Sequence, residues 1–180
     1  MSDYQITEWL PLALSGEALN SDLDDLGDVL VQVVSGGATV NFIQPFTHAD
    51  ARKYWEESVL PGVRQRKTRA IFARAGGKIV GTVLLYLAVQ PNQRHRADVG
   101  KMLVTPEYRR RGIARALMLS LEELARAEGT TLLTLDTSHG SDAEPLYRSL
   151  GFIELGVIPR YAKHPTLDIL EGAMFMYKEL

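Results

Sequence analysis

The chain has 180 residues, 46% hydrophobic and 23% charged, which are ordinary values for a folded domain and exclude a disordered chain or a coiled-coil rod. Its 20 basic and 22 acidic residues give a net charge of −2, which does not favour a nucleic-acid binder or a polybasic membrane anchor. The chain has no cysteine, and this excludes disulfides, thiolate metal sites and a cysteine nucleophile.

The length predicts a single domain over residues 1–180, because the chain has the size of one domain and no repeat or low-complexity linker interrupts it. The first residues lack a basic region followed by an apolar core, and no apolar run approaches the roughly 20 residues that span a bilayer. We therefore expect a cytoplasmic protein without a membrane segment.

Two amphipathic helices are predicted in the first third of the chain. Apolar residues recur at helical spacing between Gly16 and Val34, at Leu19, Leu23, Leu26, Leu30 and Val33. Gly36-Gly37 is expected to end this helix. A second helix is expected from about His48 to Leu60, closed by Pro61, with one side formed by Ala51, Tyr54, Trp55 and Val59.

Three strands are predicted next, over residues 70–73, 79–89 and about 94–104, and the first two form a hairpin at Gly76-Gly77. Simple alternation divides the third strand into two faces. One face holds Arg96, Asp98, Gly100, Met102 and Val104, and the other holds Ala97, Val99, Lys101 and Leu103. Since both faces carry apolar residues, we expect this strand to be central.

The remaining elements alternate between helix and strand. A helix with Ile113, Leu117, Leu121 and Leu124 in line ends at Gly129, and a buried strand follows over residues 132–137. A shorter helix begins near Ser141 or Asp142, where Ser141 and Glu144 have capping-box spacing, and a strand pair over 153–161 and 173–177 completes the chain. This order predicts an α/β (α+β) domain, a mixed sheet with helices on its faces.

The turn before the long helix at 113 is the most informative segment. Residues 109–114 read RRRGIA and follow a buried strand. The unpaired N–H groups and the positive dipole end of a helix start attract an anion, so this turn is typical of a phosphate site. Gly112 lets the backbone approach the anion, and Arg109, Arg110 and Arg111 add positive charge. The alternative is a solvated basic turn; neither a nucleotide-hydrolysing phosphate loop nor a dinucleotide fingerprint is present.

The chain resembles the GCN5-related N-acetyltransferase (GNAT) family, whose pyrophosphate motif Arg/Gln-x-x-Gly-x-Gly/Ala matches residues 109–114. A second family feature, a helix with a tyrosine followed by a Leu-Gly-Phe turn, matches Tyr147 and residues 150–152. Short motifs at 36–40, 91–92, 96–99 and 135–137 are similar to the tabtoxin resistance acetyltransferase group within the family. The resemblance implies a mostly antiparallel central sheet flanked by helices.

The resemblance also implies acetyl-CoA as the acetyl donor. Its pyrophosphate would lie on Arg109, Arg110, Arg111, Gly112, Ile113 and Ala114, and its pantetheine arm beside Met102, Leu103 and Val104. The acceptor would be a primary amine of a small molecule, which attacks the thioester directly. This fits the absence of cysteine, because holding two reactants together can itself supply roughly 7 to 11 kcal/mol.

Three residues are the predicted catalytic groups. The resemblance implies Tyr147 as the acid that protonates the departing thiolate, and Asp98 or Asp136 as the base or the ammonium anchor. Each has a structural alternative: a core aromatic for Tyr147, an ion pair with Arg96 for Asp98, and a loop or helix cap for Asp136. Phe42 and the Gly36-Gly37 loop are weaker candidates for substrate contacts.

Other chemistry receives little support from the sequence. His139 lies close to Asp136 and Ser141, but no Gly-x-Ser-x-Gly elbow accompanies it, so a hydrolase triad is not expected. The histidines lack metal-ligand spacing, and we expect no metal and no nucleic-acid partner. Two functional alternatives stay open: a catalytically silent CoA-binding regulatory module, and an enzyme that acetylates a protein N-terminus or lysine. If such domains associate, a homodimer is expected.

Overall fold

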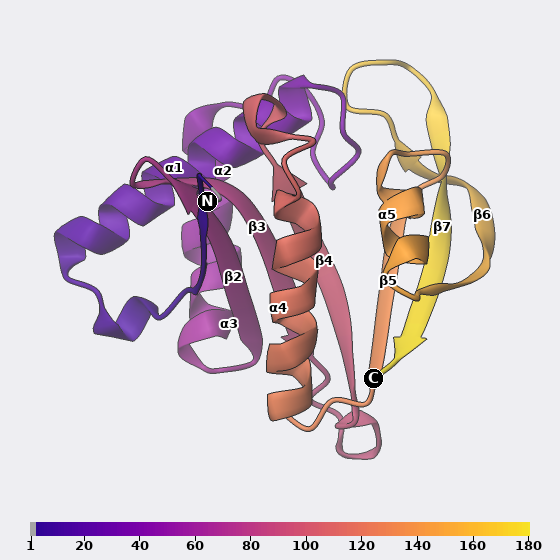
Figure 1. Ribbon diagram of the computed structural model, residues 1–180. Helices are drawn as coiled ribbons and strands as arrows, with labels where there is room; N and C mark the ends of the chain where they lie inside the picture. The colour runs from indigo at the N-terminus through magenta and orange to yellow at the C-terminus, as the bar shows by residue number, and fades with distance from the viewer. Residues whose placement is uncertain (1–2) are drawn as a thin grey trace.

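Figure 1 shows the computed structural model, which describes residues 3–180. One seven-stranded sheet has the strand order β1-β2-β3-β4-β5-β7-β6. Strands β4 and β5 are parallel, and the other described neighbours are antiparallel. The strands are β1 (Gln5–Glu8), β2 (Thr68–Ala75), β3 (Lys78–Leu87), β4 (Arg96–Val104), β5 (Leu132–Ser138), β6 (Ile153–Lys163) and β7 (Leu170–Glu179). The predicted fold, with a central β4, is confirmed.

Helices cover both faces of the sheet (Figure 1). On one face lie α1 (Gly16–Ser35), α2 (His48–Lys53), a π-helical turn η2 (Tyr54–Val59) and α3 (Leu60–Arg64). On the other face lie α4 (Ile113–Ala127) and α5 (Ala143–Ser149). Three short 3₁₀ turns are η1 (Pro11–Ala13), η3 (Pro91–Gln93) and η4 (Pro106–Tyr108). The order of helices and strands agrees with the prediction.

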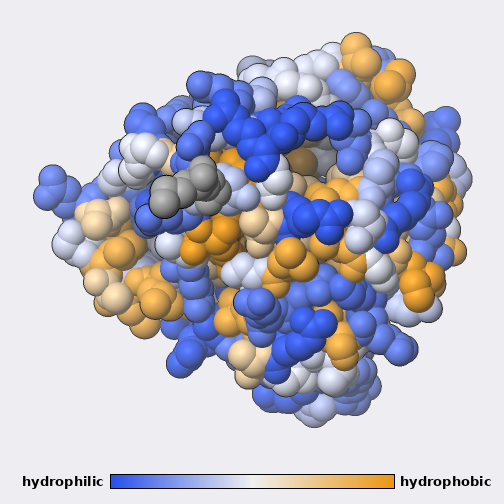
Figure 2. Space-filling model, viewed as in Figure 1, coloured by the Kyte–Doolittle hydropathy of each residue, from blue (hydrophilic) through white to orange (hydrophobic). Residues whose placement is uncertain are grey.

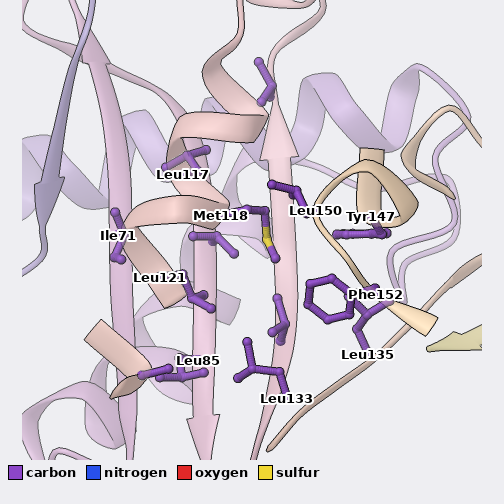
Figure 3. Close-up of a cluster of buried hydrophobic side chains, with 14 of the residues drawn as sticks. Ile71, Leu85, Leu117, Met118, Leu121, Leu133, Leu135, Tyr147, Leu150 and Phe152 are labelled. Atoms are coloured by element: carbon purple, nitrogen blue, oxygen red, sulfur yellow. The ribbon is translucent and has the colours of Figure 1, made fainter. Parts of the chain in front are cut away.

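The sheet separates two hydrophobic cores because alternate side chains of each strand point to opposite faces. In β2, Ile71 and Ala73 pack with α4, whereas Ala70 and Phe72 pack with α1 and α2. Figure 3 shows the first core, in which α4 contributes Leu117, Met118 and Leu121 and the α5 region contributes Tyr147, Leu150 and Phe152. Burial of each large apolar side chain contributes about 1.5 to 3 kcal/mol.

The helix predicted to end at Pro61 instead continues to Arg64, so this prediction is wrong. The π-helical turn η2 precedes the proline, and the Leu60 N–H donates to the carbonyl of Trp55, five residues earlier. Proline lacks an N–H and disturbs a continuous α-helix, but here it falls in the first turn of α3, where no intrahelical donor is required. The change of helical register therefore accommodates Pro61.

The predicted alternation of β4 is wrong beyond Gly100. In the pairing with β3, Gly100 stands opposite Leu84 and Leu103 opposite Thr82, which leaves Lys101 in a bulge with φ +49°. A bulge inserts one extra residue and shifts every later side chain to the other face. Lys101 is consequently directed toward the α1 and α2 side of the sheet, where its ammonium contacts Phe42.

The predicted capping box of α5 is also wrong. Asp142 is the N-cap residue and makes no side-chain cap bond. The Glu144 carboxylate accepts a hydrogen bond from the Gly140 N–H at 2.7 Å, and the Ser141 hydroxyl lies 3.2 Å from that of Thr137. The chain between β5 and α5 thus folds tightly against the end of β5.

Candidate active site

A cavity lies where β4 and β5 separate. The two strands pair only from Arg96 with Leu132 to Asp98 with Thr134 in the described ladder, and then diverge (Figure 1). A cavity of about 930 Å³ fills this split, lined by residues 99–104 of β4 and 136–138 of β5. Its lining also includes the start of α4 on one face of the sheet and residues 36–41 after α1 on the other. In Figure 2 a hollow opens near the start of α4, with hydrophilic residues above it and hydrophobic residues within and below it.

The start of α4 forms one end of this cavity. Gly112 is the N-cap residue, with φ +81°, and no side chain caps the helix. The Ala116 N–H is bonded to the Gly112 carbonyl, so the N–H groups of the residues before Ala116 have no acceptor within the helix. A Cβ added at Gly112 would meet no atom closer than 3.7 Å, so lack of space does not require a glycine here. Glycine suits this position because its backbone is left-handed and because a ligand can approach the backbone closely. The turn fits an anionic group such as a pyrophosphate.

The three arginines of this turn have different positions. Arg109 lines the cavity, and its Nε donates to the Val104 carbonyl at 3.2 Å. Arg110 also lines it and bridges to Asp142 at the start of α5, with 3.1 Å between Nη2 and Oδ2. Arg111 is outside the lining and donates to the Glu107 carbonyl, with its guanidinium over the Tyr108 ring. Arg115, on α4, lines the cavity and was not predicted.

The edge of β4 facing the split is available for an extended ligand. Beyond Asp98, β4 is paired with β3 but no longer with β5, so its backbone groups on the β5 side face the cavity. Met102, Leu103 and Val104 all line it, together with Ile113 and Ala114 of α4. An added chain could therefore bond to this edge as a further strand would.

Tyr147 reaches the cavity from α5. Its ring is 5% exposed and packs against Phe152 with 5.6 Å between centroids. Burial raises the pKa of the phenol, and the carboxylate of Asp136 raises it further. A phenol is protonated at neutral pH even at its ordinary pKa, and a raised pKa makes it a weaker acid. Tyr147 is thus both a core aromatic and a cavity residue.

Asp136 lies at the end of β5 and lines the same cavity. Partial burial raises the pKa of its carboxyl group above the ordinary value, although the Lys101 ammonium opposes this shift. A raised pKa makes a carboxylate a better proton acceptor near neutral pH. The structure therefore brings Asp136 and Tyr147 together in one cavity.

Asp98 does not line the cavity. Its carboxylate accepts hydrogen bonds from Arg96 at 2.8 Å and from the Thr134 hydroxyl on the neighbouring strand. These contacts belong to the last paired position of β4 and β5, just before the split opens. For Asp98 the geometry favours the structural alternative, an ion pair with Arg96.

Two polar features of the cavity were not predicted from the sequence. Lys101 enters it because of the bulge in β4, and burial lowers its pKa to about 8. His139 lines the cavity with Nδ1 at 3.1 Å from Glu144 Oε1, and Glu144 in turn accepts from Arg148. The available sequence signal for Lys101 was a lysine among the apolar residues of the second half of the strand, residues 99–104. The spacing of His139 and Glu144 in the sequence does not indicate that the two side chains contact each other beside the cavity.

Residues 3–180 contain neither a metal-binding cluster nor a membrane-spanning helix. No cluster of three or more histidine or acidic side chains there has an arrangement that could hold a metal ion. No helix in the same range is sufficiently long and apolar to cross a membrane.

Comparisons with known proteins identify the class. Residues 38–152 match the model of the acetyltransferase (GNAT) family. An uncharacterized N-acetyltransferase from Azospirillum brasilense, encoded in the hisH-hisA intergenic region, is 32% identical over 127 residues, which are 69% of this chain and 73% of the relative. The chain therefore belongs to the GNAT family, and the enzyme class is an acetyl-CoA-dependent N-acetyltransferase.

Solved structures agree with this fold. A ribosomal-protein-alanine N-acetyltransferase from Brucella melitensis superposes with a TM-score of 0.75 at 21% identity, over 98% of this chain and 99% of that one. A putative acetyltransferase from Salmonella typhimurium, solved with acetyl-CoA, gives 0.75 at 16% identity over 99% and 94%. Several further curated relatives are matched over 38% to 58% of their length.

Proposed function

We propose that this protein transfers the acetyl group of acetyl-CoA to a primary amine of a small molecule by direct attack. The observation that carries the proposal is one continuous cavity, which joins the uncapped start of α4 to Tyr147 and Asp136 through the split between β4 and β5. An anion-binding turn, an open strand edge and an acid–base pair are the groups that such a transfer needs.

The residues at the start of α4 would hold the pyrophosphate of acetyl-CoA. The backbone N–H groups after Gly112 and the guanidinium groups of Arg109 and Arg110 supply hydrogen bonds and positive charge at one place. The edge formed by residues 102–104 would bond the pantetheine arm. This arrangement directs the thioester toward the β5 side of the cavity, where Asp136 lies.

Asp136 is the base that we favour. An amine is mostly protonated at neutral pH, so a proton must be removed before the amine attacks the thioester carbonyl. Asp136 can bind the ammonium group and accept that proton, directly or through water. Asp98 is the weaker candidate, because Arg96 and Thr134 occupy its carboxylate.

Tyr147 would act as the acid. When the carbon–sulfur bond breaks, the electron pair leaves on sulfur, and a proton from the phenol neutralises the thiolate. The phenol of Tyr147 is protonated at neutral pH even at its ordinary pKa, so the proton is present when the thiolate forms. Such positioned acids and bases each contribute about 10² to 10⁴ in rate.

The test is a calorimetric titration with acetyl-CoA of the native protein and of Gly112→Glu, which places bulk and negative charge in the turn. We expect the native protein to bind and the variant to lose binding. Gly129→Glu is the matched control, because Gly129 has a similar φ of +78° at the other end of α4 and lies outside the cavity. A well-folded native protein that does not bind acetyl-CoA would contradict the proposal.

A second measurement separates the enzyme from a silent CoA-binding module. Tyr147→Phe keeps the ring in the core and removes the hydroxyl, so acetyl-CoA binding should persist while amine-dependent thiol release falls about 10²-fold or more. Unchanged release would remove Tyr147 from the mechanism. Acetylated peptides formed in preference to small amines would favour a protein acceptor.

Three finer assignments stay predictions from the sequence. The first is the resemblance to the tabtoxin resistance group, which rests on the short motifs at 36–40, 91–92, 96–99 and 135–137. The cytoplasmic location and the homodimer are the other two.

A further inference from the structure

Lys101 provides a positive charge inside the cavity that the proposed transfer does not use. The bulge in β4 directs its side chain toward the segment between α1 and α2. There Nζ donates to the Val40 carbonyl at 3.3 Å and lies 5.7 Å and 5.5 Å from the ring centroids of Phe42 and Tyr54. The ring faces favour a cation, so the pocket holds the ammonium form.

This ammonium group lacks an anionic partner. Among residues 3–180, no carboxylate lies within ion-pair distance of Nζ. The Asp136 carboxylate interacts with the ammonium group electrostatically, but at a distance too long for an ion pair. An ammonium group has three donors, of which the Val40 carbonyl takes one. Burial also lowers the pKa of Lys101 to about 8, because the charged form loses its contact with water.

Carboxylates occupy other parts of the same cavity. Asp136 lies on β5, and Glu171 on β7 accepts from the Thr39 hydroxyl of the segment after α1. An acceptor ammonium can be bound by these carboxylates, but it would be repelled by Lys101 unless the acceptor also brings a negative charge. The cavity thus has complementary charges for a molecule with both an amine and an anion.

We propose that Lys101 binds a carboxylate of the acceptor, so that the substrate is an amino acid or a related amine that carries a carboxylate. The proposal rests on the acetyltransferase function proposed above. A carboxylate matches the single positive charge of Lys101 better than a phosphate dianion, for which several arginine or lysine donors are usual. The aromatic rings of Phe42 and Tyr54 hold the ammonium in place, which restricts where the carboxylate binds.

The test compares each free amino acid of a panel with its carboxamide, which keeps the amine and the side chain but removes the negative charge. We measure kcat/KM by thiol release and include glucosamine 6-phosphate as an amine with a phosphate. The best amino acid should exceed its carboxamide by about 10- to 100-fold, the range expected for a charged hydrogen bond. The difference should lie mainly in KM.

Lys101→Met keeps the apolar stem and removes the charge, so it should abolish the preference for the acid over its carboxamide. Lys53→Met on α2 is the matched control, since its side chain is 69% exposed and lies outside the cavity. Should Lys101→Met not fold, the native protein gives the second measurement. The N-acetylated product of the best amino acid should raise the pKa of the Lys101 ammonium seen by NMR, and its carboxamide should not.

Several outcomes would overturn the inference and leave the acetyltransferase function intact. These are equal rates for acids and carboxamides, a preference for glucosamine 6-phosphate, or no turnover of any panel member by a protein that binds acetyl-CoA. Failure of the native protein to bind acetyl-CoA would instead contradict the proposed function itself.

Discussion

At the scale of single residues, two aspartates that look equivalent in the sequence have different surroundings. Asp136 lines the cavity and has a raised pKa, whereas Asp98 is bonded to Arg96 and Thr134. Strand alternation and the family motifs suggest both residues as the base or the ammonium anchor. These sequence patterns do not indicate where β4 and β5 stop pairing. That point depends on contacts between strands far apart in the chain.

We predict that Asp136→Asn lowers kcat by about 10²-fold or more, because the amide cannot accept the ammonium proton. Asp98→Asn should leave kcat within a few-fold and reduce stability instead, because Arg96 loses its carboxylate partner. Rates of amine-dependent thiol release and urea unfolding curves for both variants check this pair. The reverse ranking of the two rates would identify Asp98 as the base.

The proposed role of Asp136 as the base also predicts a pH dependence of the reaction. The group acts as a base only when ionised, and partial burial raises its pKa. The rate should therefore fall on acidification at a pH above the ordinary carboxyl pKa of 3.8.

A stability prediction follows from the buried charge of Lys101. The pKa of Lys101 is lowered from 10.5 to about 8 in the folded protein. Below pH 8 the lysine is protonated in both the folded and the unfolded state, and there its buried charge lowers the free energy of unfolding. Lys101→Met should raise the free energy of unfolding by about 1 to 3 kcal/mol at pH 7. This gain should shrink as the pH rises through 8 toward 10.5. Equal gains in urea unfolding at pH 7 and pH 10 would contradict the assignment.

At the scale of elements, the sequence predicts the long helices and most strands well. Helix α1 follows the predicted apolar spacing, with Ser15 as its cap and Gly36-Gly37 after its end. The failures occur where the backbone departs from a regular period. Pro61 is accommodated by a π-helical turn, and Lys101 occupies a bulge. Residue spacing carries no signal for either irregularity, because each depends on packing against other elements.

Gly100 beside this bulge is predicted to be sensitive to added volume. A Cβ there would lie 2.9 Å from Cε2 of the Tyr86 ring, so Gly100→Ala must displace that ring. We expect a loss of about 1 to 3 kcal/mol in the free energy of unfolding, as for other overpacked sites. Gly16→Ala is the control, since its added Cβ meets no atom within 4 Å and should be neutral or stabilising. Urea unfolding of both variants provides the comparison; equal stabilities would show that Tyr86 moves freely.

At the scale of the whole molecule, the cavity results from the way the sheet opens. The paired parts of β4 and β5 hold the two halves of the sheet together, and the split beyond Asp98 separates α4 from the end of β5. The family motif predicts the anion end of this cavity from the sequence. The end near Lys101 requires the three-dimensional arrangement, because α1, β4, β5 and β7 contribute to it from distant parts of the chain.

Amide hydrogen exchange should show which backbone segments contact acetyl-CoA when it binds in the split. Saturating acetyl-CoA should slow exchange at residues 99–104 and 112–115, where backbone groups face the cavity, and leave β2 nearly unchanged. At a concentration 100 times Kd, it should also stabilise the fold by about 2.7 kcal/mol. Protection that is spread evenly over the sheet would argue against a strand-like ligand in the split.

The split between β4 and β5 is lined from both faces of the sheet, by the start of α4 on one and by the segment after α1 on the other. Under the proposed function, the donor and the acceptor would approach the split from these two faces, and both could be bound before any bond changes. The proposed direct attack would then take place in a ternary complex, and the protein would not carry the acetyl group itself. Evolution could alter the acceptor through the segment after α1 without disturbing the donor turn at α4, two regions that belong to opposite sides of the molecule.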